Sequence, residues 1–435
     1  MKDVRIAFGR QGLIVPVPDD AVVVTGTAIP PLADERRAVV DALRSPLAGR
    51  RLSEIVGPGH SVVVVFPDIT RPMPNRTVLP PLLEELQNLG AGPDRVQLLC
   101  ATGTHRSATD SEMLELVGPE VFGSYAVHQH DAQSAGHTNV GDLDSTPVLL
   151  DSRYVEADVR IVTGFVEPHF FAGFSGGPKG VFPGLGALET ILEAHSRSRI
   201  ADPMATWLVT KGNPVHDFVR RAVALAPPTL SVDVTIDAHR RLTGVFAAPL
   251  PVGHEAACAF VARTAVEKVP GRFDVVLSTN GGHPLDRNLY QAVKGLAAAQ
   301  RVVCEGGVIV MAAECVDGVP SAGGFAQILS ESEGGGPQAL RSGGSSDTES
   351  ALNSSGTRPP AVLDGWQAQV LGRVLQSSKV RFYSHGLSDS EIRMAQMEPV
   401  ADLASAVAEA LGSAGTASRL CVLPEGPLTV ATAVT

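Results

Sequence analysis

The chain has 435 residues and a formal net charge of −11, with 46 acidic side chains against 35 lysines and arginines. A chain of this length can bury a large core and is expected to divide into two or three domains. The negative balance argues against a broad nucleic-acid surface. No apolar run is long enough to span a membrane, and the opening MKDVRIAFGRQG lacks the apolar core of a signal peptide.

Cysteine usage points to a reducing compartment. The five cysteines are widely scattered, are odd in number and form no CxxC pair. This pattern predicts buried, reduced thiols and a cytoplasmic location, and it disfavours a disulfide framework or a zinc site.

The first part of the chain has short apolar runs typical of strands, followed by one helical pattern. The expected elements are strands over residues 4–8, 13–17 and 21–25 and a helix over residues 38–48. The turn at residues 9–12 separates the first two strands and predicts a β-hairpin.

Four later units share one plan, in which an apolar strand ends in a loop or helix start that carries ionisable side chains. The strands are expected at residues 62–66, up to Ala101, at 159–166 and at 273–278, and the first is followed by a helix over 80–89. The ionisable residues after them are Asp68 and Arg71, His105, His169 and Lys179, and Lys294. Alternating strands and helices favour an α/β fold. Because open parallel sheets bind ligands beyond the carboxyl ends of their strands, these residues are expected to share one crevice.

Residues 164–195 combine several features of a ligand site. Six glycines lie between positions 173 and 186, and glycines let the backbone approach a ligand and offer N–H groups to phosphate. Lys179 is the one lysine among them, and it fits either a phosphate counter-charge or a covalent anchor. His169 and His195 flank it, which suggests proton transfer or metal binding.

Further candidates lie on a helix expected from about Arg287, where Tyr290 and Lys294 share a face beside Gln291. Each candidate also has a plain structural interpretation. A lone histidine on an apolar helix face is more often a core residue, and a lone lysine in a glycine-rich loop is weak evidence. His128 and His130 alternate as metal ligands can, but no third ligand is visible. The combination of motifs favours function.

The C-terminal part changes character at residues 331–360, where glycine and serine dominate and a flexible surface loop is predicted. Helices over 366–375 and 400–411 and strands over 379–383 and 419–423 are expected around and after it. The predicted organisation is an N-terminal α/β domain over 1–265 with the glycine loop and the histidines, a C-terminal α/β domain over 270–415, and a terminal strand within 416–435.

Four motifs together resemble the nickel-dependent lactate racemase family of 2-hydroxyacid racemases and epimerases. They are DITRP, ATGTHR, PHFFAGFSGGPKG with the downstream EAH, and LDRNLYQAVKG. The resemblance covers nearly the whole chain and implies two α/β domains with the active site in the crevice between them. It also implies an isomerase whose nickel-bearing pyridinium-3,5-bisthiocarboxylic acid mononucleotide is attached to a lysine.

Carried onto matching positions, the resemblance implies a role for each candidate. Lys179 would hold the cofactor and His195 would bind nickel, with His105 and His169 as paired acid/base groups. Arg71 and Lys294 would hold the substrate carboxylate, Tyr290 and Gln291 would line the pocket, and Asp68 would lie near substrate and cofactor. The cofactor phosphate would suit the N–H groups of Ser175, Gly176 and Gly177.

The implied reaction inverts C2 of a lactate-like 2-hydroxyacid by hydride transfer to the cofactor. The implied partners are that small acid and the enzymes that build the cofactor, with no nucleic acid and no membrane. An alternative within the family is that this chain performs the same chemistry on malate or a larger hydroxyacid in place of lactate. The residues also fit a Schiff-base enzyme that uses pyridoxal phosphate, although such an enzyme would not need a metal ligand at His195. A non-catalytic carrier of the nickel nucleotide is a third hypothesis, although a carrier would not need a histidine pair.

Overall fold

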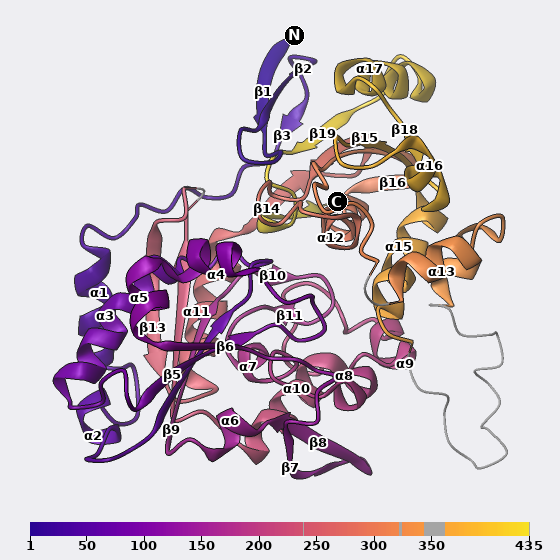
Figure 1. Cartoon of the computed structure of the whole chain (residues 1–435). Helices are drawn as coiled ribbons and strands as arrows, with labels where there is room; N and C mark the ends of the chain where they lie inside the picture. The colour runs from indigo at the N-terminus through magenta and orange to yellow at the C-terminus, as the bar shows by residue number, and fades with distance from the viewer. Residues whose placement is uncertain (238, 322–323, 343–361, 435) are drawn as a thin grey trace, which may run out of the picture. The chain divides into compact units, whose positions relative to one another are not determined.

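The computed structural model describes residues 1–237, 239–321, 324–342 and 362–434 (Figure 1). The chain divides into two compact units. Unit 1 comprises Met1–Thr27, His195–Ala201 and Ala265–Thr435, and unit 2 comprises Ala28–Ala194 and Asp202–Thr264. Both units are built on a largely parallel sheet with helices, so the predicted α/β class is confirmed.

Unit 2 contains a six-stranded sheet in the order β13-β12-β9-β4-β5-β6. The strands are β4 (Val62–Pro67), β5 (Val96–Ala101), β6 (Ala126–Gln129), β9 (Val159–Phe165), β12 (Leu230–Ile236) and β13 (Leu242–Ala248). All neighbours are parallel except the edge strand β13. The central strand β4 reads VVVVFP and is buried almost throughout, as expected for a parallel strand covered on both faces.

Helices and two small hairpins complete unit 2. The helices are α1 (Glu35–Arg44), α2 (Leu52–Ile55), α3 (Asn75–Asn88), α4 (Asp110–Val117), α5 (Pro119–Ser124), α6 (Ser152–Glu156), α7 (Pro178–Val181), α8 (Leu188–Ala194), α10 (Pro214–Leu225) and α11 (Val252–Thr264). The hairpins pair β7 (His137–Leu143) with β8 (Thr146–Asp151) and β10 (Pro168–His169) with β11 (Gly173–Phe174). Apolar residues of α1 and α3 pack with the sheet in one core.

Unit 1 has a second six-stranded sheet, fully parallel, in the order β18-β17-β16-β15-β19-β3. Its strands are β3 (Val22–Val23), β15 (Phe273–Thr279), β16 (Val303–Ala312), β17 (Lys379–Tyr383), β18 (Glu398–Pro399) and β19 (Leu420–Leu423). Two smaller pairs join β1 (Lys2–Ile6) to β2 (Leu13–Val17) and β14 (Val266–Pro270) to β20 (Val430–Val434). The helices are α9 (Arg197–Ala201), α12 (Leu289–Gln300), α13 (Phe325–Glu331), α14 (Gly336–Arg341), α15 (Gly365–Ser377), α16 (Asp389–Met394) and α17 (Leu403–Ala414).

Most predicted elements are present near their expected bounds, including the N-terminal hairpin and the strand ending at Ala101. The helix predicted over 80–89 starts earlier, at Asn75, with Pro80 and Pro81 inside it. Proline favours the first turn of a helix, which is why the sequence alone placed the start too late. The helix predicted over 38–48 spans Glu35–Arg44.

The division of the chain differs from the predicted continuous domain over residues 1–265. Met1–Thr27 belongs to unit 1 because β3 pairs in parallel with β19, near the other end of the chain. Strand pairing between distant segments leaves no local signal in the sequence. The predicted loop over 331–360 also differs at its start, where Gly336–Arg341 is helical, while its residues 343–360 lie outside the described residues.

The core of unit 2 supplies a stability prediction. Leu82 in α3 is fully buried, so Leu82→Ala leaves a cavity and should lower the free energy of unfolding by about 2–5 kcal/mol. Leu114 in α4 is 41% exposed, and Leu114→Ala should change the free energy of unfolding by about 0.5 kcal/mol or less. Denaturant unfolding checks both, and equal effects would contradict this assignment of the core.

Candidate active site

The parallel sheet of unit 2 brings three predicted loops to one edge. Strands β9, β4 and β5 are consecutive neighbours and run parallel, so their carboxyl ends lie at the same edge. The segments that follow them carry Asp68, His105 and His169. The first two are in direct contact, since His105 Nδ1 lies 2.7 Å from Asp68 Oδ2. The sheet therefore joins residues that are 37 positions apart in the sequence.

Asp68 is the centre of a hydrogen-bonded network. It is buried, and its Oδ1 accepts the hydroxyl of Thr70 at 2.7 Å. Arg71 Nη1 donates to the same hydroxyl at 3.2 Å. Burial raises the pKa of Asp68, but the charge and hydrogen bond of His105, the charge of Arg71 and the Thr70 hydroxyl outweigh it and lower this pKa overall. An ionised carboxylate accepts the Nδ1–H of His105, which makes Nε2 the nitrogen that can take up a proton.

His169 is held by hydrogen bonds that its Nδ1 accepts, whereas the Nδ1–H of His105 donates. It ends β10, and its Nδ1 accepts the main-chain N–H groups of Phe171 at 3.4 Å and Ala172 at 3.2 Å. The rings of Phe170 and Phe171 pack on its imidazole, with centroids 4.8 and 4.5 Å away. Because Nδ1 is an acceptor, the neutral ring carries its proton on Nε2. His105 and His169 therefore present Nε2 in different states, one as acceptor and one as donor.

The loop over residues 175–177, the glycine loop, is hydrogen-bonded to other parts of unit 2. The N–H of Ser175 donates to the carbonyl of Glu167 at 2.9 Å, and the N–H of Gly177 donates to Asp233 Oδ1 at 2.7 Å. Two of these N–H groups thus have protein acceptors, and one acceptor, Asp233, is 56 positions away in the sequence. Phosphate binding by Ser175, Gly176 and Gly177 stays a prediction. Gly176 keeps a positive φ of 73°, which favours glycine.

Lys179 sits in the short helix α7 directly after this loop and is half-buried. Its Nζ lies 5.8 Å from the ring centroid of Phe171. Burial, together with the positive charge of Arg71, lowers the pKa of Lys179 to about 7. A large fraction of this amine is therefore neutral near pH 7, as a nucleophilic lysine requires.

Unit 1 holds a second group of predicted residues. His195 follows α8 and is buried, with its ring centroid 4.7 Å from that of Trp366. Trp366 Nε1 donates to the hydroxyl of Tyr290 at 2.7 Å. Lys294 and Gln291 are buried on the same helix, α12. Trp366 thus links the predicted metal ligand to a predicted substrate residue, and sequence reasoning gave it no role, although the chain has only 2 tryptophans.

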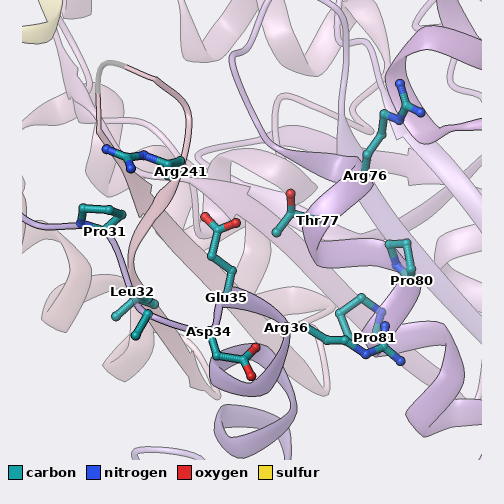
Figure 2. Close-up of a pocket in the computed structure, with 11 residues that line it drawn as sticks. Pro31, Leu32, Asp34, Glu35, Arg36, Arg76, Thr77, Pro80, Pro81 and Arg241 are labelled. Atoms are coloured by element: carbon teal, nitrogen blue, oxygen red, sulfur yellow. The ribbon is translucent and has the colours of Figure 1, made fainter.

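A surface hollow of about 680 Å³ lies elsewhere in unit 2, beside the starts of α1 and α3 (Figure 2). Its charged lining includes Asp34, Glu35, Arg76 and Arg241. None of the predicted site residues lines it, so it is separate from the candidate site.

Within the ranges that the structure describes, no three His, Cys, Asp or Glu side chains gather as a metal-binding group. The helices in the same ranges are all too short or too polar to cross a membrane.

Unit 2 is thus an α/β fold in which Asp68, His105 and His169 follow neighbouring parallel strands, and Lys179, whose pKa is lowered to about 7, lies in α7. Residues 8–207 match the lactate racemase N-terminal domain, and residues 266–431 match the lactate racemase C-terminal domain. The chain belongs to the lactate racemase family, and it is an isomerase of the racemase class.

Individual relatives agree over nearly the full length. The chain is 33% identical to the lactate racemase of Thermoanaerobacterium thermosaccharolyticum over 98% of each chain, and 32% identical to that of Lactiplantibacillus plantarum over 90% of each. The apoprotein structure of the former aligns with a TM-score of 0.86 at 31% identity, covering 99% of this chain and 100% of that one. A Thermotoga maritima crystal structure shares the fold, with a TM-score of 0.68 at 18% identity over 92% of this chain and 98% of that one.

The lowered pKa of Lys179 generates a testable prediction. Only the neutral amine reacts in reductive methylation, so the rate at Lys179 should rise with pH to half its maximum near pH 7. Arg71→Ala removes a neighbouring positive charge, which makes the ammonium less unfavourable and should move the midpoint upward. Peptide mass spectrometry measures the rate, with the exposed Lys211 as the reference. A midpoint near the ordinary 10.5 would contradict the buried environment of Lys179.

Proposed function

We propose that this protein is a 2-hydroxyacid racemase, with lactate or a close analogue as its substrate, that works with a lysine-held nickel nucleotide. The observation that carries the proposal is the half-buried Lys179, whose lowered pKa suits an amine that forms a covalent bond. The relatives named lactate racemase support the substrate class. Location in the cytoplasm remains a prediction from the sequence.

The residues present fit such a cofactor. Lys179 lies in α7, which directly follows the loop over residues 175–177, and its Nζ lies 5.8 Å from the ring centroid of Phe171, so its amine is held in a partly buried place that suits a covalent attachment. His195 offers an imidazole, a common nickel ligand, held by ring contact with Trp366. When bound, the nickel pyridinium nucleotide supplies an electron-poor carbon that accepts hydride from C2 of the substrate.

His105 is the proton acceptor for the substrate hydroxyl in this proposal. Its Nδ1 is bonded to Asp68, so Nε2 takes up the proton while the carboxylate stabilises the resulting imidazolium. His169 presents Nε2–H as the partner group, and its ring is fixed by two main-chain N–H donors. Holding both rings in place removes the need to order them during the reaction.

The remaining roles concern the substrate carboxylate. Arg71 has a guanidinium anchored on Thr70, and its planar fork suits a carboxylate. Lys294, buried in α12, is assigned to bind the same carboxylate of the substrate. Tyr290 and Gln291 are assigned to the wall of the substrate pocket. Each assignment follows from the matching motif.

The Asp68–His105 pair favours catalysis over a mere carrier, because storing a nucleotide requires no oriented proton acceptor. A Schiff base between Lys179 and pyridoxal phosphate would also use a neutral amine, so the nature of the lysine adduct decides between the two enzymes.

The hydride route is tested by racemisation of lactate in heavy water. The C2–H of a hydroxycarboxylate is a very weak acid, so a histidine does not remove it readily, whereas hydride held on carbon does not exchange with solvent. The product should keep its C2 hydrogen, as measured by mass spectrometry after one turnover. Extensive deuterium at C2 would favour proton abstraction and refute the hydride route.

The tether is tested on protein produced together with the cofactor-building enzymes. Intact mass should show an adduct that Lys179→Ala abolishes, while His195→Gln should keep the adduct and lose bound nickel. Lys211→Ala, which changes an exposed lysine of the same unit, should lose neither. An adduct that survives in Lys179→Ala would rule out this attachment site, and an aldimine absorption band removed by hydroxylamine would indicate pyridoxal phosphate.

A further inference from the structure

A buried carboxylate and a buried imidazole lie directly against the glycine loop of unit 2. Asp233, in β12, is fully buried, and its Oδ1 accepts the N–H of Gly177 at 2.7 Å while Oδ2 accepts the hydroxyl of Ser231 at 3.0 Å. His254, in α11, is 2% exposed, and its Nε2 donates to the carbonyl oxygen of Ser175 at 2.9 Å. The loop is thus bonded to side chains from two elements that lie far along the chain.

Three glycines make room for these two side chains. A Cβ atom at Gly164 would lie 2.5 Å from Asp233 Oδ1, and one at Gly176 would lie 2.8 Å from the same oxygen. A Cβ atom at Gly177 would lie 2.4 Å from the ring of His254. All three distances are too short for any larger residue. Packing against Asp233 and His254, and at Gly176 also against Val166, therefore requires glycine at these three positions.

The same contacts fix the backbone that carries Lys179. Gly177 immediately precedes α7, and the N–H of Lys179 donates to the carbonyl of Gly176 at 3.0 Å. Without its two partners, the loop would bury the N–H of Gly177 and the carbonyl of Ser175 without hydrogen bonds, which is unfavourable. The loop would then move to recover such bonds, and the start of α7 would move with it.

We propose that Asp233 and His254 are positioning residues that hold the loop over residues 175–177 so that Lys179 presents its amine for attachment of the cofactor. The inference rests on the proposed function of Lys179 as the tether. Neither residue belongs to the motifs that carry the family resemblance, and neither is assigned contact with substrate or cofactor. They act through the lysine.

The role assigned to Asp233 is that of a hydrogen-bond acceptor. An amide in its place keeps an oxygen for the N–H of Gly177, and its NH₂ group can donate to the hydroxyl of Ser231, which also accepts. Burial raises the pKa of Asp233, against the opposing effects of His254, the N–H of Gly177 and the hydroxyl of Ser231. Asp233→Asn is therefore expected to preserve the support, whereas Asp233→Leu removes it. His254→Gln and His254→Leu form the equivalent pair.

The test uses the full chain in two forms, loaded by production with the cofactor-building enzymes and unloaded by production without them. Intact mass measures the fraction of loaded protein with the Lys179 adduct. Reductive methylation with formaldehyde measures the reactivity of Lys179 in the unloaded protein, and thermal unfolding measures stability. Asp151→Leu is the matched control, because Asp151 is another buried carboxylate of unit 2, bonded to His130 and Arg153 and not to the loop.

The expected result is a loss of roughly tenfold or more in the adduct fraction for Asp233→Leu and His254→Leu, with a changed methylation rate at Lys179. The Asn and Gln variants should stay close to the unsubstituted protein. Asp151→Leu should lower the unfolding temperature and leave both Lys179 measurements unchanged. A merely structural role would give the same result for the Asp151 and Asp233 variants.

Folded Asp233→Leu and His254→Leu proteins with normal loading and normal Lys179 methylation would overturn the inference. If either Leu variant fails to fold, Gly164→Ala provides the second test, because its Cβ atom would lie 2.5 Å from Asp233 Oδ1 and 3.1 Å from Gly177 N, so the hydrogen bond between those two atoms must shift. A normal adduct fraction and a normal methylation rate at Lys179 in that variant would equally refute the proposed support of the loop by Asp233. If the unsubstituted protein gains no adduct, the proposed function fails instead. The role of Asp233 and His254 is then tested by the methylation rates alone.

Discussion

The candidate site of unit 2 depends on the parallel alignment of β9, β4 and β5. Residue Val65 pairs with Val162, and Pro67 pairs with Ala101, so the three strands end at one edge of the sheet. The segments that leave this edge carry Asp68, His105 and His169. Parallel strands require long crossover connections, which explains why residues so far apart in sequence become neighbours. The Asp68–His105 contact exists only because that alignment exists.

Burial has different electrostatic effects on the charged groups of unit 2. The pKa of Asp68 is lowered in spite of burial, because His105, Arg71 and Thr70 stabilise its negative charge. The pKa of Lys179 is lowered because burial disfavours its ammonium and Arg71 adds repulsion. The positive charge of Arg71 thus favours the ionised form of Asp68 and the neutral form of Lys179. One fixed cation contributes to both protonation states, as expected where partial burial strengthens charge interactions.

Unit 1 shows how a short excursion of the chain places a side chain. Residues His195–Ala201 belong to unit 1 although the sequence on both sides of them belongs to unit 2. Within unit 1, Gln369 Nε2 donates to the carbonyl of Arg197 at 3.2 Å, and Trp366 packs against His195. Both partners come from α15, which follows the glycine- and serine-rich segment. The environment of His195 is therefore set by residues about 170 positions away.

The sequence by itself determined the α/β class, most of the strands and the residue types of the candidate site. Apolar runs such as Val62–Phe66 and the turn at residues 9–12 between the first two strands are local patterns, and local patterns survive in the sequence. Only the tertiary structure placed Met1–Thr27 in unit 1, gave His105 its carboxylate partner and brought Asp233 and His254 to the glycine loop. Strand order, burial and hydrogen bonds between distant segments decided these features, because each depends on which segments become neighbours after folding.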